Sequence, residues 1–111
     1  MIKSYFIIDE GLISETYIPF VDRTTIGRSP SNSLRLPDPS VSRQHAIVYL
    51  VKDRTVVEDL GSRNGTFVNE RRVKKAVLSC GDNLRLGRVS LRYDQQDVDS
   101  DWSSLVDTVV S

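Results

Sequence analysis

Two residue types that build many functional sites are nearly missing from this sequence. Its 111 residues include one cysteine, Cys80, and one histidine. A single cysteine excludes an internal disulfide framework and any metal site built from several cysteines, and it favours the reducing cytoplasm as the compartment. The apolar runs are only a few residues long, which excludes a transmembrane helix. The N-terminus lacks a signal-peptide pattern. We therefore expect a soluble cytoplasmic protein with no membrane partner.

The same scarcity argues against catalysis. Neither the histidine nor the cysteine lies in a nucleophile-elbow or metal-ligand pattern. The six glycines are scattered singly, so the chain has no glycine-rich nucleotide loop. We expect no enzymatic activity, no metal and no cofactor. Cys80, where a strand pattern passes into a turn, is expected to be a small packing residue.

The net charge is zero, with 15 Lys and Arg against 15 Asp and Glu, but these charges are unevenly placed. Residues 94–111 contain five aspartates and no basic residue. Residues 1–93 therefore carry all 15 basic residues against the other 10 acidic ones, a balance of +5. The pattern predicts a basic domain over 1–93 followed by an acidic tail or linker over 94–111.

Strand signals dominate the basic domain. Short β-branched or aromatic runs occupy 5–8, 46–51 and 55–57, and apolar residues alternate around Gly87. Turn residues separate these runs at short intervals, and no stretch sustains a helical period over three turns. This pattern predicts an all-β sandwich or barrel, with loops at one end as the natural place for a binding site.

The tail has a different period. Its apolar residues are spaced as on one face of a helix: Trp102, Leu105, Val106, Val109 and Val110. Isolated helices of this length are marginal in water. We therefore expect a short amphipathic C-terminal helix that needs something to bury Trp102 against: this domain, a partner or further chain.

Four loop segments stand out between the strand runs. The first is Gly27-Arg28, and the second is Ser42-Arg43-Gln44-His45. The third is the stretch 59–69, which includes Arg63-Asn64-Gly65-Thr66, and the fourth is 78–87. Each has an ordinary structural explanation when taken alone; Asn-Gly, for example, is a common hairpin signal.

In this order and spacing, however, the segments resemble the forkhead-associated (FHA) domain family. The motifs cover residues 24–87, and the strand pattern extends the resemblance to about 2–93. The resemblance implies a β-sandwich of about eleven strands whose apical loops bind phosphothreonine in an extended peptide. Arg28, Ser42 and Arg43 would contact the phosphate, and Arg63 and Asn64 the peptide backbone. Gly27, His45, Gly65 and Thr66 would support the site structurally.

The chemistry of these residue types agrees with such a site. Phosphothreonine carries close to two negative charges and several strong acceptor oxygens. A guanidinium presents planar, permanently charged donors that can grip a phosphate in two places. A serine hydroxyl adds a short donor, and the amide of Asn64 offers both a donor and an acceptor to a peptide unit.

One departure from the family pattern lies beside the third segment. Asn69 is followed by Glu70, where glycine is common in the family, and then by four cations among residues 71–75. This run could attract acidic residues of a ligand, but we favour a solvated hairpin.

The expected function is therefore phosphorylation-dependent protein–protein interaction in Ser/Thr kinase signalling. The partner would be a phosphothreonine-containing protein, such as a Ser/Thr kinase or its substrate. Nucleic-acid binding is disfavoured because no basic stripe interleaved with aromatic residues is present. A phosphate-independent FHA-type interaction module, or self-association through the C-terminal tail, is the alternative.

Overall fold

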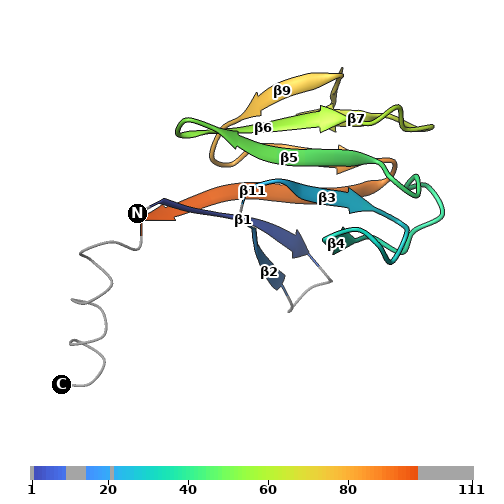
Figure 1. Ribbon diagram of the computed structural model, residues 1–111, viewed down its shortest axis with the longest axis horizontal. Coiled ribbons are helices and arrows are strands. Elements are labelled where there is room, and N and C mark those ends of the chain that lie inside the picture. The colour runs from blue at the N-terminus through green and yellow to red at the C-terminus, as the bar shows by residue number, and fades with distance from the viewer. Residues whose placement is uncertain (1, 10–14, 21, 98–111) are drawn as a thin grey trace.

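Two stacked β-sheets make up the described part of the computed structural model, residues 2–9, 15–20 and 22–97 (Figure 1). These residues contain no helix, and the expected all-β sandwich of about eleven strands is confirmed. The eleven strands are β1 (Ile2–Asp9), β2 (Glu15–Phe20), β3 (Thr24–Gly27), β4 (Leu34–Arg35), β5 (Ala46–Val51), β6 (Arg54–Asp59), β7 (Thr66–Val68), β8 (Arg71–Val73), β9 (Lys75–Leu78), β10 (Asn83–Leu86) and β11 (Val89–Asp97).

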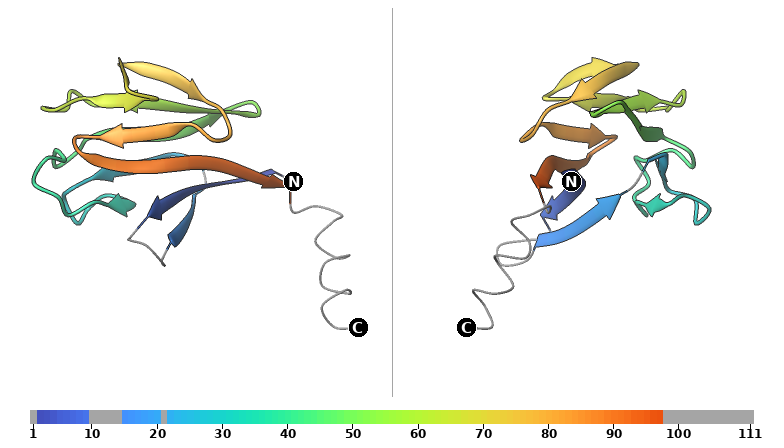
Figure 2. Two further views of the ribbon diagram at one scale, coloured as in Figure 1. Left: turned by 180° about the vertical axis from the view of Figure 1, so that it is seen from behind. Right: turned by 60° about the vertical axis from the view of Figure 1, so that its left-hand side comes forward.

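Strand pairing places distant parts of the chain side by side. The six-stranded sheet has the order β2-β1-β11-β10-β7-β8, and the five-stranded sheet the order β4-β3-β5-β6-β9. The first and last strands are antiparallel neighbours, with Ile2 opposite Asp97 and Phe6 opposite Tyr93. Both ends of the described chain therefore lie together at one end of the sandwich (Figure 2, left).

Alternation of side chains explains how the last two strands bury one face. Leu84 and Leu86 of β10 and Leu91 and Tyr93 of β11 point inward and are fully buried, while Arg92 between the last pair is exposed. Strand β11 continues to Asp97, four residues beyond the expected domain end, because it pairs along β1. Residues 98–111, with the expected amphipathic helix, lie outside the described residues.

The core lies between the two sheets. Aliphatic residues of both sheets fill it, together with Phe6, which stacks on Phe20 at 4.7 Å between ring centroids. Tyr93 brings a hydroxyl into this core. That hydroxyl hydrogen-bonds to Thr55 Oγ1 of the opposite sheet at 2.6 Å and to Ser4 Oγ at 3.2 Å, so the buried polar group is satisfied.

Different loops lie at the two ends of the sandwich. The loops after β3, β4 and β6 emerge at one end, while the start of β1, the end of β11 and the β5–β6 turn lie at the other (Figure 1). No helix among the described residues has the length and apolar character needed to cross a membrane.

Candidate anion-binding groove

Three loops converge at one end of the sandwich and line a groove of about 330 Å³. The loops follow β3, β4 and β6, and the sequence motifs fall within them. The lining residues are Arg28, Pro39, Ser40, Val41, Ser42, Arg43, Gln44, Arg63 and Asn64. All five residues expected to contact the ligand therefore line one groove, and three of them are arginines.

Arg28 follows the last residue of β3 and is held in place through one edge of its guanidinium. Its Nε donates to the Val41 carbonyl at 3.0 Å, and its backbone N–H donates to the Ser42 carbonyl at 2.9 Å. The two terminal nitrogens bond to no residue that the structure describes. The side chain is thus oriented by the protein, with its remaining donors available to an anion in the groove.

Gly27 lets the loop after β4 approach β3 closely. A Cβ at this position would lie 2.2 Å from the carbonyl oxygen of Arg43, far inside van der Waals contact. The same carbonyl accepts hydrogen bonds from the Ser29 N–H and from the Asn32 side-chain amide. The absence of a side chain at Gly27 therefore allows the Ser42-Arg43 segment to lie beside Arg28.

His45 is fully buried beneath the groove and joins two of its loops. Its Nδ1 accepts from the Ser42 N–H at 3.1 Å, and its Nε2 lies 2.9 Å from the Gly65 carbonyl. Because Nδ1 is an acceptor, the imidazole proton sits on Nε2 and is donated to Gly65. His45 is not among the residues that line the groove, and it acts on Ser42 through the backbone.

Ser42 and Asn64 each use part of their hydrogen-bonding capacity within the protein. Ser42 Oγ accepts from the Arg63 N–H at 3.0 Å, which leaves its own proton to donate. Asn64 Nδ2 donates to the Ser40 carbonyl at 2.8 Å, which leaves its amide oxygen and a second N–H. Both side chains are therefore positioned by the protein and retain groups for a ligand.

Asp59, at the end of β6, organises the loop that carries Arg63 and Asn64. Its carboxylate accepts from the N–H groups of Gly61 and Ser62 and from the hydroxyls of Ser62 and Thr66. Burial raises the pKa of Asp59, but these hydrogen bonds outweigh it and hold the pKa below its usual value. Thr66 is fully buried in this network.

A second carboxylate, that of Asp38, supports the opposite wall of the groove. It accepts from the N–H and hydroxyl of Ser40 and from Arg88 Nε, at 2.7–3.1 Å to Oδ1. The hydrogen bonds from Ser40, together with Arg88, lower the pKa of Asp38. Ser40 in turn accepts from the Arg88 N–H through its hydroxyl and from Asn64 through its carbonyl.

These two carboxylates were missed as functional residues at the level of the sequence. For Asp59, the sequence did contain a signal. An aspartate that starts a loop commonly accepts hydrogen bonds from the N–H groups two and three residues later, as in an Asx turn. For Asp38 and Arg88, 50 residues apart, no local signal exists. Their contact depends on the turn between β10 and β11 lying beside the loop after β4.

Cys80 differs from its expected role. We expected a small packing residue, but the side chain is exposed, and its Sγ lies 3.6 Å from Gln95 Oε1. The prediction was wrong because β10 begins only at Asn83, so Cys80 falls in the surface loop before that strand. Partial burial of the thiol and the nearby Asp94 raise the pKa of Cys80, which keeps it protonated rather than nucleophilic.

The cationic run at residues 71–75, which follows the third loop segment (59–69), lies mostly at the surface. Arg71, Arg72, Lys74 and Lys75 are exposed, and none of them lines the groove. Glu70 pairs with Arg85 at 3.0 Å. Within residues 2–9, 15–20 and 22–97, no group of three or more His, Cys, Asp or Glu side chains is arranged to hold a metal ion.

We compared the sequence with models of protein families and with curated proteins. The model of the FHA domain matches residues 24–87. Over 70 residues the chain is 43% identical to the glycogen accumulation regulator GarA of Mycobacterium tuberculosis, covering 63% of this chain and 43% of GarA. It is 40% identical over 72 residues to the oxoglutarate dehydrogenase inhibitor of Corynebacterium jeikeium, covering 65% and 50% of the two chains. The match thus spans half or less of these relatives.

Comparison with solved structures agrees. A chain from a structural and functional study of phosphothreonine-dependent FHA domain interactions superposes with a TM-score of 0.75 and 29% identity. The superposition covers 86% of this chain and 98% of the other. The similarity therefore includes strands on both sides of the 24–87 segment.

Proposed function

This chain belongs to the FHA domain family, and from that membership we propose that its groove binds phosphothreonine within an extended peptide of a partner protein. The observation that carries the proposal is the hydrogen bonding of the Arg28 guanidinium. The protein holds its guanidinium through Nε, its terminal nitrogens bond to no described residue, and Arg28 lines the groove together with two further arginines. A dianionic phosphate matches this donor set in charge and in number of acceptors.

The proposed roles divide between the phosphate and the peptide backbone. Arg28 and the hydroxyl of Ser42 donate to phosphate oxygens, and Arg43 adds a second cation. Asn64 uses its amide oxygen and remaining N–H to bind the peptide unit beside the phosphothreonine, with Arg63 next to it. The proposed activity is binding without turnover.

The expected affinity follows from these contacts. Hydrogen bonds to charged groups contribute about 1.5–3 kcal/mol each. Several of them, opposed by the cost of ordering an extended peptide, correspond to about −8 kcal/mol, or a Kd of about 1 μM. Such an interaction is reversible and suits regulation by a kinase and a phosphatase. The names of the two relatives, a regulator and an inhibitor, support a regulatory role for this chain.

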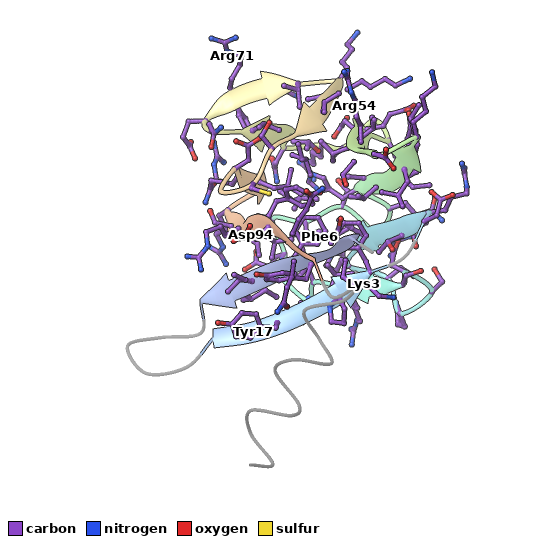
Figure 3. The ribbon with its side chains drawn as sticks, turned by 90° about the vertical axis from the view of Figure 1, so that its left-hand side faces the viewer. Lys3, Phe6, Tyr17, Arg54, Arg71 and Asp94 are labelled. Atoms are coloured by element: carbon purple, nitrogen blue, oxygen red, sulfur yellow. The ribbon has the colours of Figure 1, made fainter. Side chains whose placement is uncertain are left out.

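The test compares Arg28→Ala with Arg54→Ala, an exposed arginine at the opposite end of the sandwich (Figure 3). We expect Arg28→Ala to weaken binding of a fluorescent phosphothreonine peptide by about 3 kcal/mol, more than a hundredfold, because a charged pair is lost. Arg54→Ala should bind as the unaltered protein does. Fluorescence anisotropy gives the affinities, and thermal unfolding reports whether both variants are folded.

The same titration is repeated with unphosphorylated peptide and with phosphoserine peptide drawn from a degenerate library. The partner is expected to be a protein phosphorylated on threonine by a Ser/Thr kinase, or such a kinase itself. Equal affinity of Arg28→Ala and unaltered protein for the phosphothreonine peptide would remove Arg28 from the site. Equal affinity for phosphorylated and unphosphorylated peptide would favour a phosphate-independent interaction instead.

A further inference from the structure

A second hollow lies at the other end of the sandwich and has a different chemical character. It has a volume of about 430 Å³ and is lined by Lys3, Ser4, Tyr5, Tyr17, Pro19 and Gln96. Tyr5 and Tyr17 pack at 5.8 Å between ring centroids, yet Tyr17 remains 59% exposed. Figure 3 shows Tyr17 and Lys3 on the β1–β2 side of the molecule, away from Arg54 and Arg71. We call this hollow the tyrosine groove.

The tyrosine groove continues around the edge strand β2. An adjoining hollow shares Lys3 and Pro19 with it, and its other lining residues include Arg23 and the apolar Ile18, Phe20 and Leu34. The two hollows together present aromatic and aliphatic surface beside two cations. Apolar surface of this kind beside basic residues fits a segment that is both apolar and acidic.

The chain itself contains such a segment directly after β11. Residues 98–111 carry three aspartates and no basic residue, and their apolar residues recur at the spacing of one helix face. Trp102 is the largest of these and is the only tryptophan of the protein. A tryptophan ring combines a large apolar surface with one N–H donor, which suits a groove with aromatic walls and a polar rim.

The segment 98–111 begins next to the tyrosine groove. Gln96, which lines the groove, pairs with Lys3 and directly precedes the last described residue, Asp97. Five residues lead from Asp97 to Trp102, a reach of up to about 17 Å. A segment tethered beside its binding surface has a high effective concentration there, so a small apolar contact is sufficient.

We propose that residues 98–111 fold back on the six-stranded sheet and place Trp102 in the tyrosine groove of the same chain. The indole packs against Tyr5, Tyr17 and Pro19, and the aspartates lie near Lys3 and Arg23. The proposed contact lies at the end of the sandwich opposite the arginine-lined groove and does not depend on phosphopeptide binding.

The experiment uses the fluorescence of the single tryptophan. In the full chain, Trp102 should emit at shorter wavelength than in the free peptide 98–111, and acrylamide should quench it less. Tyr17→Ser removes an exposed wall of the groove without opening the core, so its emission and quenching should move to those of the free peptide. Lys3→Glu should move them in the same direction.

The matched control is Val77→Ser on the edge strand β9 of the other sheet, where the side chain is 50% exposed. This variant should leave Trp102 emission and quenching unchanged. Three results would overturn the proposal. They are equal quenching of Trp102 in the full chain and the free peptide, no effect of Tyr17→Ser, and signals that change on dilution, which would place the tail on a second copy.

Discussion

Asp59 connects the fold to the groove through a single carboxylate. Four donors from the loop 61–66 converge on it, and that loop holds Arg63 and Asn64 at the groove. Since these hydrogen bonds lower the pKa of Asp59, the folded state prefers the ionised carboxylate. A group whose pKa is lowered on folding stabilises the protein above its unfolded pKa, and this contribution is lost as the pH falls through the folded pKa.

Asp59→Asn should therefore destabilise the protein in a pH-dependent way. An amide cannot accept from all four donors, so we expect a loss of about 1–2 kcal/mol in the free energy of unfolding at pH 7. The difference from the unaltered protein should narrow as the pH falls below the usual range of aspartate, where both carry a neutral side chain. Urea unfolding at a series of pH values measures it. A difference that stays constant with pH would contradict the role of the charge.

The hairpin between β7 and β8 shows how one element accommodates an unfavourable residue. Val68 and Arg71 pair across a two-residue turn in which Asn69 and Glu70 have φ angles of 50° and 66°. Positive φ at both positions is the geometry of a type I′ turn, which favours glycine at the second. Glu70 occupies that position and offsets part of the cost by its pair with Arg85.

Replacing Glu70 separates these two effects. Both Glu70→Ala and Glu70→Gly lose the pair with Arg85, but only glycine relieves the positive φ. We expect the glycine variant to be more stable than the alanine variant by about 1 kcal/mol in thermal or urea unfolding.

Glu58, the second-to-last residue of β6, provides the control for this pair of substitutions. It also faces a cation, with Lys75 Nζ at 3.9 Å, but its backbone φ is not positive. There the order should reverse, with glycine less stable than alanine. The same order at both positions would mean that backbone strain at Glu70 is not the cause.

The residues that line the groove could be predicted from the sequence, but most of the residues that hold its loops in place could not. Arg28, Ser42 and Asn64 were expected in the site because the motifs around them resemble those of the FHA family, and all three line one groove. The contact of Asp38 with Arg88 arises from strand order, which local patterns do not encode. The end of β11 was also not predictable, because the polar residues after Tyr93 resemble a linker until their pairing with β1 is known.

At the scale of the whole molecule, positive charge is concentrated on the domain that carries the groove. The net charge is zero, but residues 1–97, up to the end of β11, carry 15 basic against 12 acidic residues, a balance of +3, and three arginines line the groove. Exposed charges attract an anionic ligand over a distance of about one Debye length, roughly 10 Å at 0.1 M salt. This attraction acts mainly on encounter with the ligand.

Raising the salt concentration should therefore slow association of a phosphothreonine peptide more than it speeds dissociation. Stopped-flow measurements between 0.02 and about 0.5 M salt are expected to show the association rate constant falling severalfold or more. Sucrose at matched solution viscosity serves as the control and should leave the rate near its starting value. An association rate that is independent of salt would argue against long-range attraction by the basic domain.

The pairing of β1 with β11 has a practical consequence for how this domain can be attached to other objects. Ile2 and Asp97 are opposite each other, and the start of β1 and the end of β11 lie at the end of the sandwich away from the loops that form the arginine-lined groove (Figure 1). A neighbouring domain, a reporter protein or a sensor surface joined directly before Ile2 or directly after Asp97 is therefore held behind the sandwich. The groove then faces outward, and a long phosphorylated protein can reach it without steric interference from the attachment.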